Sequence, residues 1–249
     1  MQKEKYIDYV RILKEELIPA LGCTEPIALA YASSLCGRTL GELPQKCSVK
    51  VSGNLIKNVK SVIVPNTGGL KGIEAAIAAG IIAVDPGARL EVLSSIREEQ
   101  YQEITDYLGQ HEIKVDVAGT DETFYIDLEM TGQNHCARVV MASYHTNVVL
   151  LEKDGVVQKI QGCSEVATEE MTDRSCLDIQ SIIEFARTVE LSEVRESLER
   201  QIAYNMAIAE EGIHGKWGAQ VGRTYLEAYD SENILIKAKA YAAAGSDAR

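Results

Sequence analysis

The chain has 249 residues, of which 46% are hydrophobic, and its formal net charge is −12. This length and composition allow one large buried core or two modest ones, which excludes a disordered chain. The negative charge is spread along the sequence without a basic run, so we expect neither nucleic acid nor an anionic membrane surface as a partner.

The N-terminal segment and the cysteines bear on the compartment. Residues 1–20 carry many charged side chains and no signal-peptide core, and no apolar run reaches the roughly 18 residues of a membrane span. We therefore expect a cytoplasmic protein with mostly reduced thiols. No C-x-x-C pair occurs, so no self-contained zinc or ferredoxin-type site is expected among the six cysteines, Cys23, Cys36, Cys47, Cys136, Cys163 and Cys176.

Two helices are expected at the start of the chain. Apolar residues recur at helical spacing over residues 3–18, and Pro19 and Gly22 end that helix. A second helix from Pro26 to about Leu35 has almost no polar face. A helix of this kind should be buried on most sides.

Cys23 lies just before the N-terminus of this second helix. Thr24 or Glu25 is the expected N-cap, and the sequence does not decide between them. Either choice leaves Cys23 beside unpaired backbone N–H groups and the positive end of the helix dipole, which favours a thiolate. The alternative interpretation is a buried structural cysteine, since free cysteine is often buried.

The stretch Leu21–Ala32, LGCTEPIALAYA, resembles the N-terminal signature of the L-cysteine desulfidase family, whose members are related to the alpha chain of iron-sulfur L-serine dehydratases. The resemblance implies that Cys23 is a ligand of a 4Fe-4S cluster. It also implies an amino-acid β-elimination lyase that converts L-cysteine to pyruvate, ammonia and sulfide.

A glycine-rich turn follows a predicted hairpin. Alternating residues at 47–51 and a β-branched run at 59–64 predict the two strands, and residues 65–72 then lead into a helix at 73–79. Backbone N–H groups in such a turn can converge on an anion, although most such turns are only turns. The spacing is not that of a nucleotide motif. The resembled family carries a similar TGG…GIEAA segment, which implies that Thr67, Gly68 and Gly69 bind substrate.

Residues 81–161 are expected to be mostly strands. Strands are predicted at 90–93, 113–117 and 124–130 with a helix at about 97–108, and a meander follows at 137–142, 147–151 and 156–160. The resulting sheet should be largely antiparallel, which excludes a doubly wound nucleotide fold.

The turn at 143–147 places polar side chains between two strands of this meander. A single histidine in a hairpin is commonly a solvated surface residue, but the tripeptide His145-Thr146-Asn147 matches the pattern of the resembled family. We expect His145 to act in catalysis, and Thr146 and Asn147 to bind the substrate carboxylate or assist proton transfer. The histidines at 111, 135 and 214 have no such support.

The rest of the chain is predicted to be helical after a polar connector at 162–176. The expected fold class is α+β, a helical domain interrupted by a largely antiparallel sheet insertion. Residues 1–40 and 176–249 would form the helical domain, and residues 45–162 the sheet domain.

The chain ends at GSDAR directly after an apolar helix. Members of the resembled family continue beyond a similar segment, and their remaining cluster cysteines lie in that continuation. The expectation from the resemblance is therefore an N-terminal fragment that is cluster-free and inactive alone. The other five cysteines match no family ligand position.

The sequence is also compatible with other functions. The chain could be an amino-acid-sensing module without chemistry, an L-serine dehydratase-like enzyme, or a thiolate enzyme in which a histidine activates Cys23. The expected partner is a small amino acid, whose identity the sequence does not reveal. The sequence also leaves open the general base and the choice between monomer and homodimer.

Overall fold

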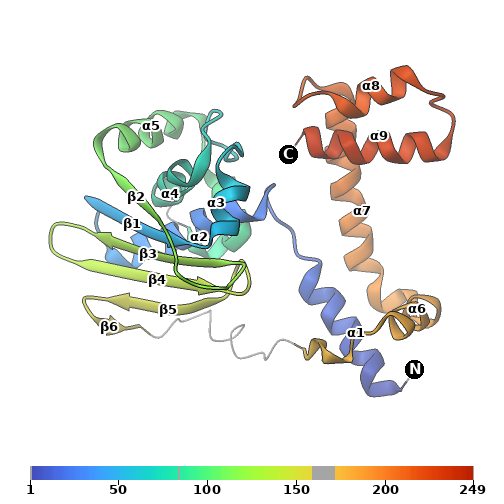
Figure 1. Cartoon of the computed structure of the whole chain (residues 1–249), viewed down its shortest axis with the longest axis horizontal. Coiled ribbons are helices and arrows are strands. Elements are labelled where there is room, and N and C mark those ends of the chain that lie inside the picture. Colours follow the sequence, from blue (N-terminus) through green and yellow to red (C-terminus); the bar gives the residue numbers. More distant parts are fainter. Residues whose placement is uncertain (1, 84, 159–171, 249) are drawn as a thin grey trace. The chain divides into compact units, whose positions relative to one another are not determined.

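A computed structural model describes residues 2–83, 85–158 and 172–248 (Figure 1). The fold class is α+β, and the chain divides into two compact units. One unit, the sheet unit, comprises Pro19–Glu169. The other, the helical unit, combines Met1–Ile18 with Glu170–Arg249.

The sheet unit is built on a six-stranded sheet in the order β2-β1-β3-β4-β5-β6. Strand β1 pairs in parallel with β2, and all the other pairs are antiparallel. The expectation of a largely antiparallel sheet is confirmed. The strands are β1 (Lys46–Val51), β2 (Ile113–Val117), β3 (Tyr125–Thr131), β4 (Cys136–Ala142), β5 (Val148–Lys153) and β6 (Val156–Val157).

Helices cover one face of this sheet. Buried residues alternate along β1 and β3, as expected for strands with one face on the core. The same hydrophobic core contains the apolar side chains of the two longest helices of the unit. The helical segments are α2 (Thr24–Leu40), α3 (Gly53–Val59), α4 (Gly72–Ala83), η1 (Pro86–Ser95), η2 (Glu98–Gln100) and α5 (Tyr101–Gln110).

Helix α2 belongs to the sheet unit, although residues 1–40 were expected to lie together in the helical domain. Its side chains Ile27, Leu29 and Tyr31 are at most 2% exposed and share a core with Val49 of β1. The physical reason is its composition, because a helix that is apolar on all sides gains most where both a sheet and another helix can cover it.

Two predicted strands are wrong. Residues 59–64 do not pair with β1, because Ser52 caps a helix instead, its Oγ accepting from the backbone N–H of Leu55 at 3.4 Å. The segment retains a single bridge, between Ile63 and Lys71. Residues 90–93 lie in η1, which is two short 3₁₀ turns joined at Arg89. The expected connector at 162–176 falls mostly outside the described residues.

Helices α2 and α4 cross closely at Gly80. A Cβ built at position 80 would overlap Oγ of Ser33 and the carbonyl oxygen of Ala30. Only glycine allows the two backbones this approach, and the contact holds α2 against the helix that begins at the glycine-rich turn.

The helical unit has a smaller core. Tyr9 and Val10 of α1 (Lys3–Glu16) pack with Phe185 and Val194. The aromatic rings of Tyr9 and Phe185 lie 5.2 Å apart between centroids. The other segments are η3 (Arg174–Cys176), α6 (Ile179–Thr188), α7 (Leu191–His214), α8 (Val221–Ala228) and α9 (Ile234–Asp247).

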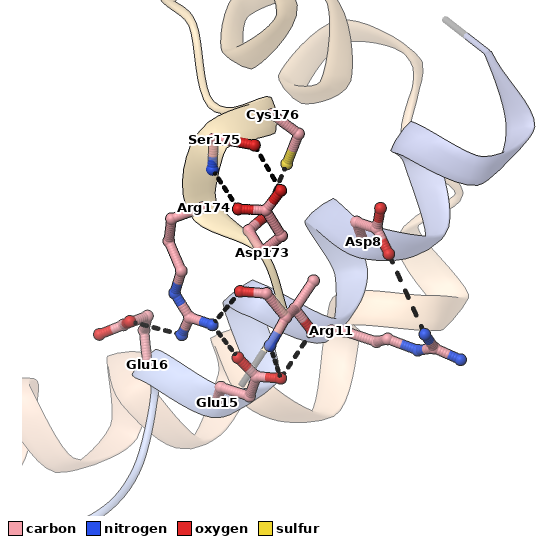
Figure 2. A network of polar contacts seen from close by, with 9 residues as sticks. Asp8, Arg11, Glu15, Glu16, Asp173, Arg174, Ser175 and Cys176 are labelled. Atoms are coloured by element: carbon pink, nitrogen blue, oxygen red, sulfur yellow. Dashed lines mark hydrogen bonds and ion pairs between the residues drawn. The ribbon is translucent and has the colours of Figure 1, made fainter. Parts of the chain in front are cut away.

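Ion pairs join the two sequence-distant parts of the helical unit (Figure 2). Arg174 of η3 pairs with Glu16 at 2.9 Å and also with Glu15, and Glu15 accepts from Oγ1 of Thr172 at 2.7 Å. These contacts lower the pKa of Glu15 despite its partial burial, which raises it. The C-terminal end of α1 is thereby fixed to the segment that precedes α6.

In the described part of the chain, none of the helices has the length and apolar character needed to cross a membrane.

We expect Gly80→Ala to lower the free energy of unfolding by about 2–4 kcal/mol, because the new methyl group must separate α2 from α4. The matched control is Gly109→Ala in α5, where a Cβ meets no atom within 4 Å. That variant should be neutral or stabilised by up to about 1 kcal/mol, since alanine favours helices. Denaturant unfolding of both variants measures the difference, and equal effects would contradict the close crossing.

Candidate functional site

Cys23 is itself the N-cap of α2, so the expectation that Thr24 or Glu25 caps the helix is wrong. Its backbone is extended, with φ −66° and ψ 124°, and its side chain makes no capping hydrogen bond. Sγ instead donates to Oε2 of Glu25, 3.3 Å away. The half-buried thiol therefore lies against a carboxylate at the start of a buried helix.

Glu25 connects three parts of the sheet unit. Its Oε1 accepts from Nδ2 of Asn58 in α3 at 3.1 Å, and its Oε2 accepts from Cys23. Burial raises the pKa of Glu25. Hydrogen bonds from its own backbone N–H, from Cys23 and from Asn58, together with the charge of His145, lower the pKa by more than burial raises it. The net result is a pKa below the ordinary value. Glu25 is thus an anion at neutral pH at the positive end of a helix.

His145 approaches Glu25 from the hairpin tip between β4 and β5. Its ring packs on Phe124 with 4.5 Å between centroids, and burial lowers its pKa while the charge of Glu25 raises it. The net pKa lies below the ordinary value, so the imidazole is neutral at pH 7. Its Nε2 is buried and has no hydrogen-bond partner among the described residues. A neutral imidazole with a buried, unpartnered nitrogen can take up a proton.

The glycine-rich turn is a tight loop with three residues in the left-handed region. Asn66, Gly68 and Gly69 have φ of 54°, 70° and 95°. Thr67 is 2% exposed, and its Oγ1 donates to the carbonyl of Val64 at 2.7 Å. The Thr67 side chain therefore holds the loop closed, and any ligand contact from residues 67–69 would come from their backbone.

Direct contacts bring this turn to the N-terminus of α2. A Cβ at Gly22, which has φ 100°, would lie 3.4 Å from Cγ of Pro65. The backbone N–H of Leu21 donates to the carbonyl of Leu90 at 3.3 Å, and Nδ2 of Asn66 donates to the carbonyl of Leu93 at 2.9 Å. Segment η1 thus binds both the loop before Cys23 and the glycine-rich turn.

The other two predicted residues lie at the hairpin tip. Nδ2 of Asn147 donates to the carbonyl of Ala142 at 2.9 Å, and its backbone closes the same turn. The Asn147 side chain therefore shapes the loop that carries His145. Thr146, between His145 and Asn147 in the sequence, is half-buried.

The structure thus brings Cys23 and His145 to one carboxylate and sets the glycine-rich turn beside it. Sequence reasoning missed that Glu25 joins them, although it lies two residues after Cys23 in the same motif. It also missed Asn58, because α3 was predicted as part of a hairpin. The catalytic and binding roles of His145, Thr67, Gly68, Gly69, Thr146 and Asn147 stay predictions.

The described cysteines do not form a cluster site. Burial raises the pKa of Cys36 and raises that of Cys47 to about 12, so both are core thiols. Cys176 belongs to the helical unit, and Cys163 lies outside the described residues. Among the residues that the structure describes, no three His, Cys, Asp or Glu side chains could hold a metal ion. Of the described cysteines, Cys23 is the one that contacts Glu25.

The helical unit has a pocket of its own, which none of these residues line. Its lining includes Ile213, His214, Arg223 and Glu227. The charged groups are already paired, Arg223 with Glu227 at 3.3 Å and His214 with Glu210 at 3.4 Å. Because the pocket contains none of the predicted site residues, we assign no function to it.

Comparison with known proteins finds relatives along the whole chain. A protein of Desulfitobacterium hafniense is 46% identical over 248 residues, which cover 100% of this chain and 57% of the relative. A protein of Lachnoclostridium phytofermentans is 43% identical over 98% of this chain and 58% of its own length, and one of Aeromonas hydrophila is 36% identical over 99% and 57%. All three are named UPF0597 proteins.

The chain thus spans less than two thirds of the length of these UPF0597 relatives. No family model matches the sequence. No solved structure matches it.

We expect His145→Gln to reduce the loss of stability in mild acid. Below the ordinary histidine pKa of about 6.5, the unfolded chain binds a proton that the folded imidazole resists. Stability from this group is therefore complete above about pH 6.5 and falls as the pH falls towards the lowered folded pKa. Urea unfolding between pH 7.5 and 5 measures the slope. His214→Gln, at an exposed position, is the control, and identical slopes in the two variants would contradict the buried neutral imidazole.

Proposed function

We propose that this chain forms part of the active site of an amino-acid β-elimination lyase of the L-cysteine desulfidase type. The observation that carries the proposal is the meeting of Cys23 and His145 at the carboxylate of Glu25. The resemblance of residues 21–32 to that family supplies the reaction class. The names of the relatives say nothing about a reaction.

In this proposal His145 is the general base. β-Elimination begins with removal of the α-proton of the amino acid, and a neutral imidazole with a lowered pKa can accept it at Nε2. The electron pair of the C–H bond forms the Cα–Cβ double bond while the Cβ–S bond breaks and sulfide leaves. The enamine tautomerises, and one water molecule hydrolyses it to pyruvate and ammonia.

Glu25 would support the base. Once His145 holds the proton, the imidazolium faces the carboxylate, whose negative charge stabilises it. Asn58 keeps the carboxylate in place through its 3.1 Å hydrogen bond. The substrate carboxylate would bind to backbone groups of residues 67–69 and to Thr146 and Asn147, as the sequence predicts.

The resemblance also implies a 4Fe-4S cluster, which acts as a Lewis acid on the leaving group. The described residues offer one site thiol, Cys23, and that is too few to hold such a cluster. Cys23 would be a single ligand of such a cluster, and the proton transfer to His145 does not depend on it. The leaving group is sulfide if the substrate is cysteine and hydroxide if it is serine. The proposal keeps the expected cytoplasmic location.

The test compares L-cysteine turnover by this chain and by the longer Desulfitobacterium relative, both reconstituted with iron and sulfide without oxygen. We expect pyruvate and sulfide in equal amounts from the relative. Replacing its residue that aligns with His145 by asparagine should lower kcat by at least about 100-fold, because the base is lost. Replacing the residue that aligns with Cys23 by serine should abolish turnover.

The matched control replaces the relative's residue that aligns with Cys136, at the far end of β4 from the hairpin tip, by serine, and it should keep activity. Turnover that survives both site replacements would reject the proposal. Tight amino-acid binding without any product would instead favour a sensing module.

A further inference from the structure

The middle of helix α7 is apolar and yet exposed. Residues 201–209 contain no charged side chain, and seven of the nine are apolar. Every residue from 201 to 207 is nevertheless exposed, among them Ile202 at 60% and Met206 at 44%. A helix that is apolar on most sides is normally buried, as α2 is in the sheet unit. The composition of this stretch therefore indicates a surface that another element covers.

The exposed side chains belong to an apolar stripe that is buried at both of its ends. The stripe consists of Leu198, Ile202, Met206, Ala209 and Ile213, which recur at helical spacing. Leu198 packs against the small core that α1, α6 and the start of α7 form. Ala209 and Ile213 are at most 9% exposed, in the part of α7 that packs on α9. The stretch between them runs from α1 and α6 towards α8 and α9 (Figure 1).

The uncovered stretch has the size of a docking site for one helix. The eleven-residue step from Leu198 to Ala209 rises about 16 Å along α7. A helix with its side chains is about 10 Å across, so one helix fits between the two buried ends. Because the stripe carries no charge, the helix that covers it must present apolar side chains.

The relatives have a further part that can supply such a helix. In the proteins of Desulfitobacterium, Lachnoclostridium and Aeromonas, the matched region makes up only 57–58% of the length. The additional part is therefore common to all three. A large apolar surface on one part of a protein is expected where a second part packs on it.

We propose that the stripe from Leu198 to Ile213 docks an apolar helix from the polypeptide that lies outside the matched region in the longer relatives. The docked helix would join the two buried ends of the stripe into one continuous core. The proposal concerns the helical unit and does not depend on the lyase activity.

The test measures how fast iodoacetamide alkylates an introduced cysteine, with each site read separately by peptide mass spectrometry and each rate divided by the rate in denaturant. In this chain, Met206→Cys should react within about 3-fold of the control Glu196→Cys, because both positions are exposed. Glu196 belongs to α7 but lies outside the stripe. In the Desulfitobacterium relative, a cysteine aligned with Met206 should react at least about 10-fold more slowly than one aligned with Glu196, since the docked helix covers it.

Ile202→Cys is a second reporter of the stripe and should show the same contrast between the two proteins. Equal rates at the stripe and control positions of the relative would overturn the proposal. Slow alkylation of Met206→Cys in the 249-residue chain itself would also overturn it, and slowing that grows with protein concentration would identify a second copy as the occupant. A protected stripe in a relative without amino-acid turnover would leave the proposal standing and reject only the lyase.

Discussion

The burial of helix α2 is the constraint on which the candidate site depends. Its apolar side chains pack on the sheet and against α4, and the contact at Gly80 leaves no room for the two helices to slide. A helix fixed in this way has a fixed first turn. Cys23 and Glu25 therefore have defined positions even though both are only half-buried. The same crossing fixes the start of α4, to which the glycine-rich turn is joined.

Glu25 sets the electrostatics of the site. Its carboxylate lies at the positive end of α2 and accepts hydrogen bonds from Cys23 and Asn58. Burial raises its pKa, but these bonds, its own backbone N–H and the charge of His145 together lower the pKa below the ordinary value. The resulting charge acts on His145, whose burial on Phe124 keeps the imidazole neutral. A neutral base next to a fixed anion suits proton transfer, because the protonated form gains a partner that the neutral form lacks.

The sequence predicted the elements that have a clear hydrophobic period. The alternation of strands β3 to β5 and the composition of α2 lead to an α+β fold with an antiparallel sheet, which the structure bears out. The β-branched run at 59–64 was wrongly predicted as a strand, because such a run also fits the end of a short helix and the loop after it. Ser52 caps that helix and so begins α3 in place of the predicted turn. Residues 90–93 were also wrongly predicted as a strand, since the three apolar residues of this short, largely buried 3₁₀ segment have no spacing that distinguishes it from a strand.

The site was predictable in part for comparable reasons. Cys23 and His145 stand out by chemical type, but their approach to one carboxylate depends on the pairing of β4 with β3 and on the packing of α2, which no local pattern encodes. Asn58 has no sequence signal, because it lies in a helix that was predicted as part of a hairpin. Contacts between residues far apart in the chain thus supplied what local patterns could not.

The account depends most on the coupling between Glu25 and His145, and NMR titration of the His145 ring in Glu25→Gln measures it directly. Removal of the negative charge should lower the pKa of His145 below its value in the unmodified chain, because the charge of Glu25 raises it. An unchanged or raised pKa would show that the two side chains do not interact and would contradict the candidate site.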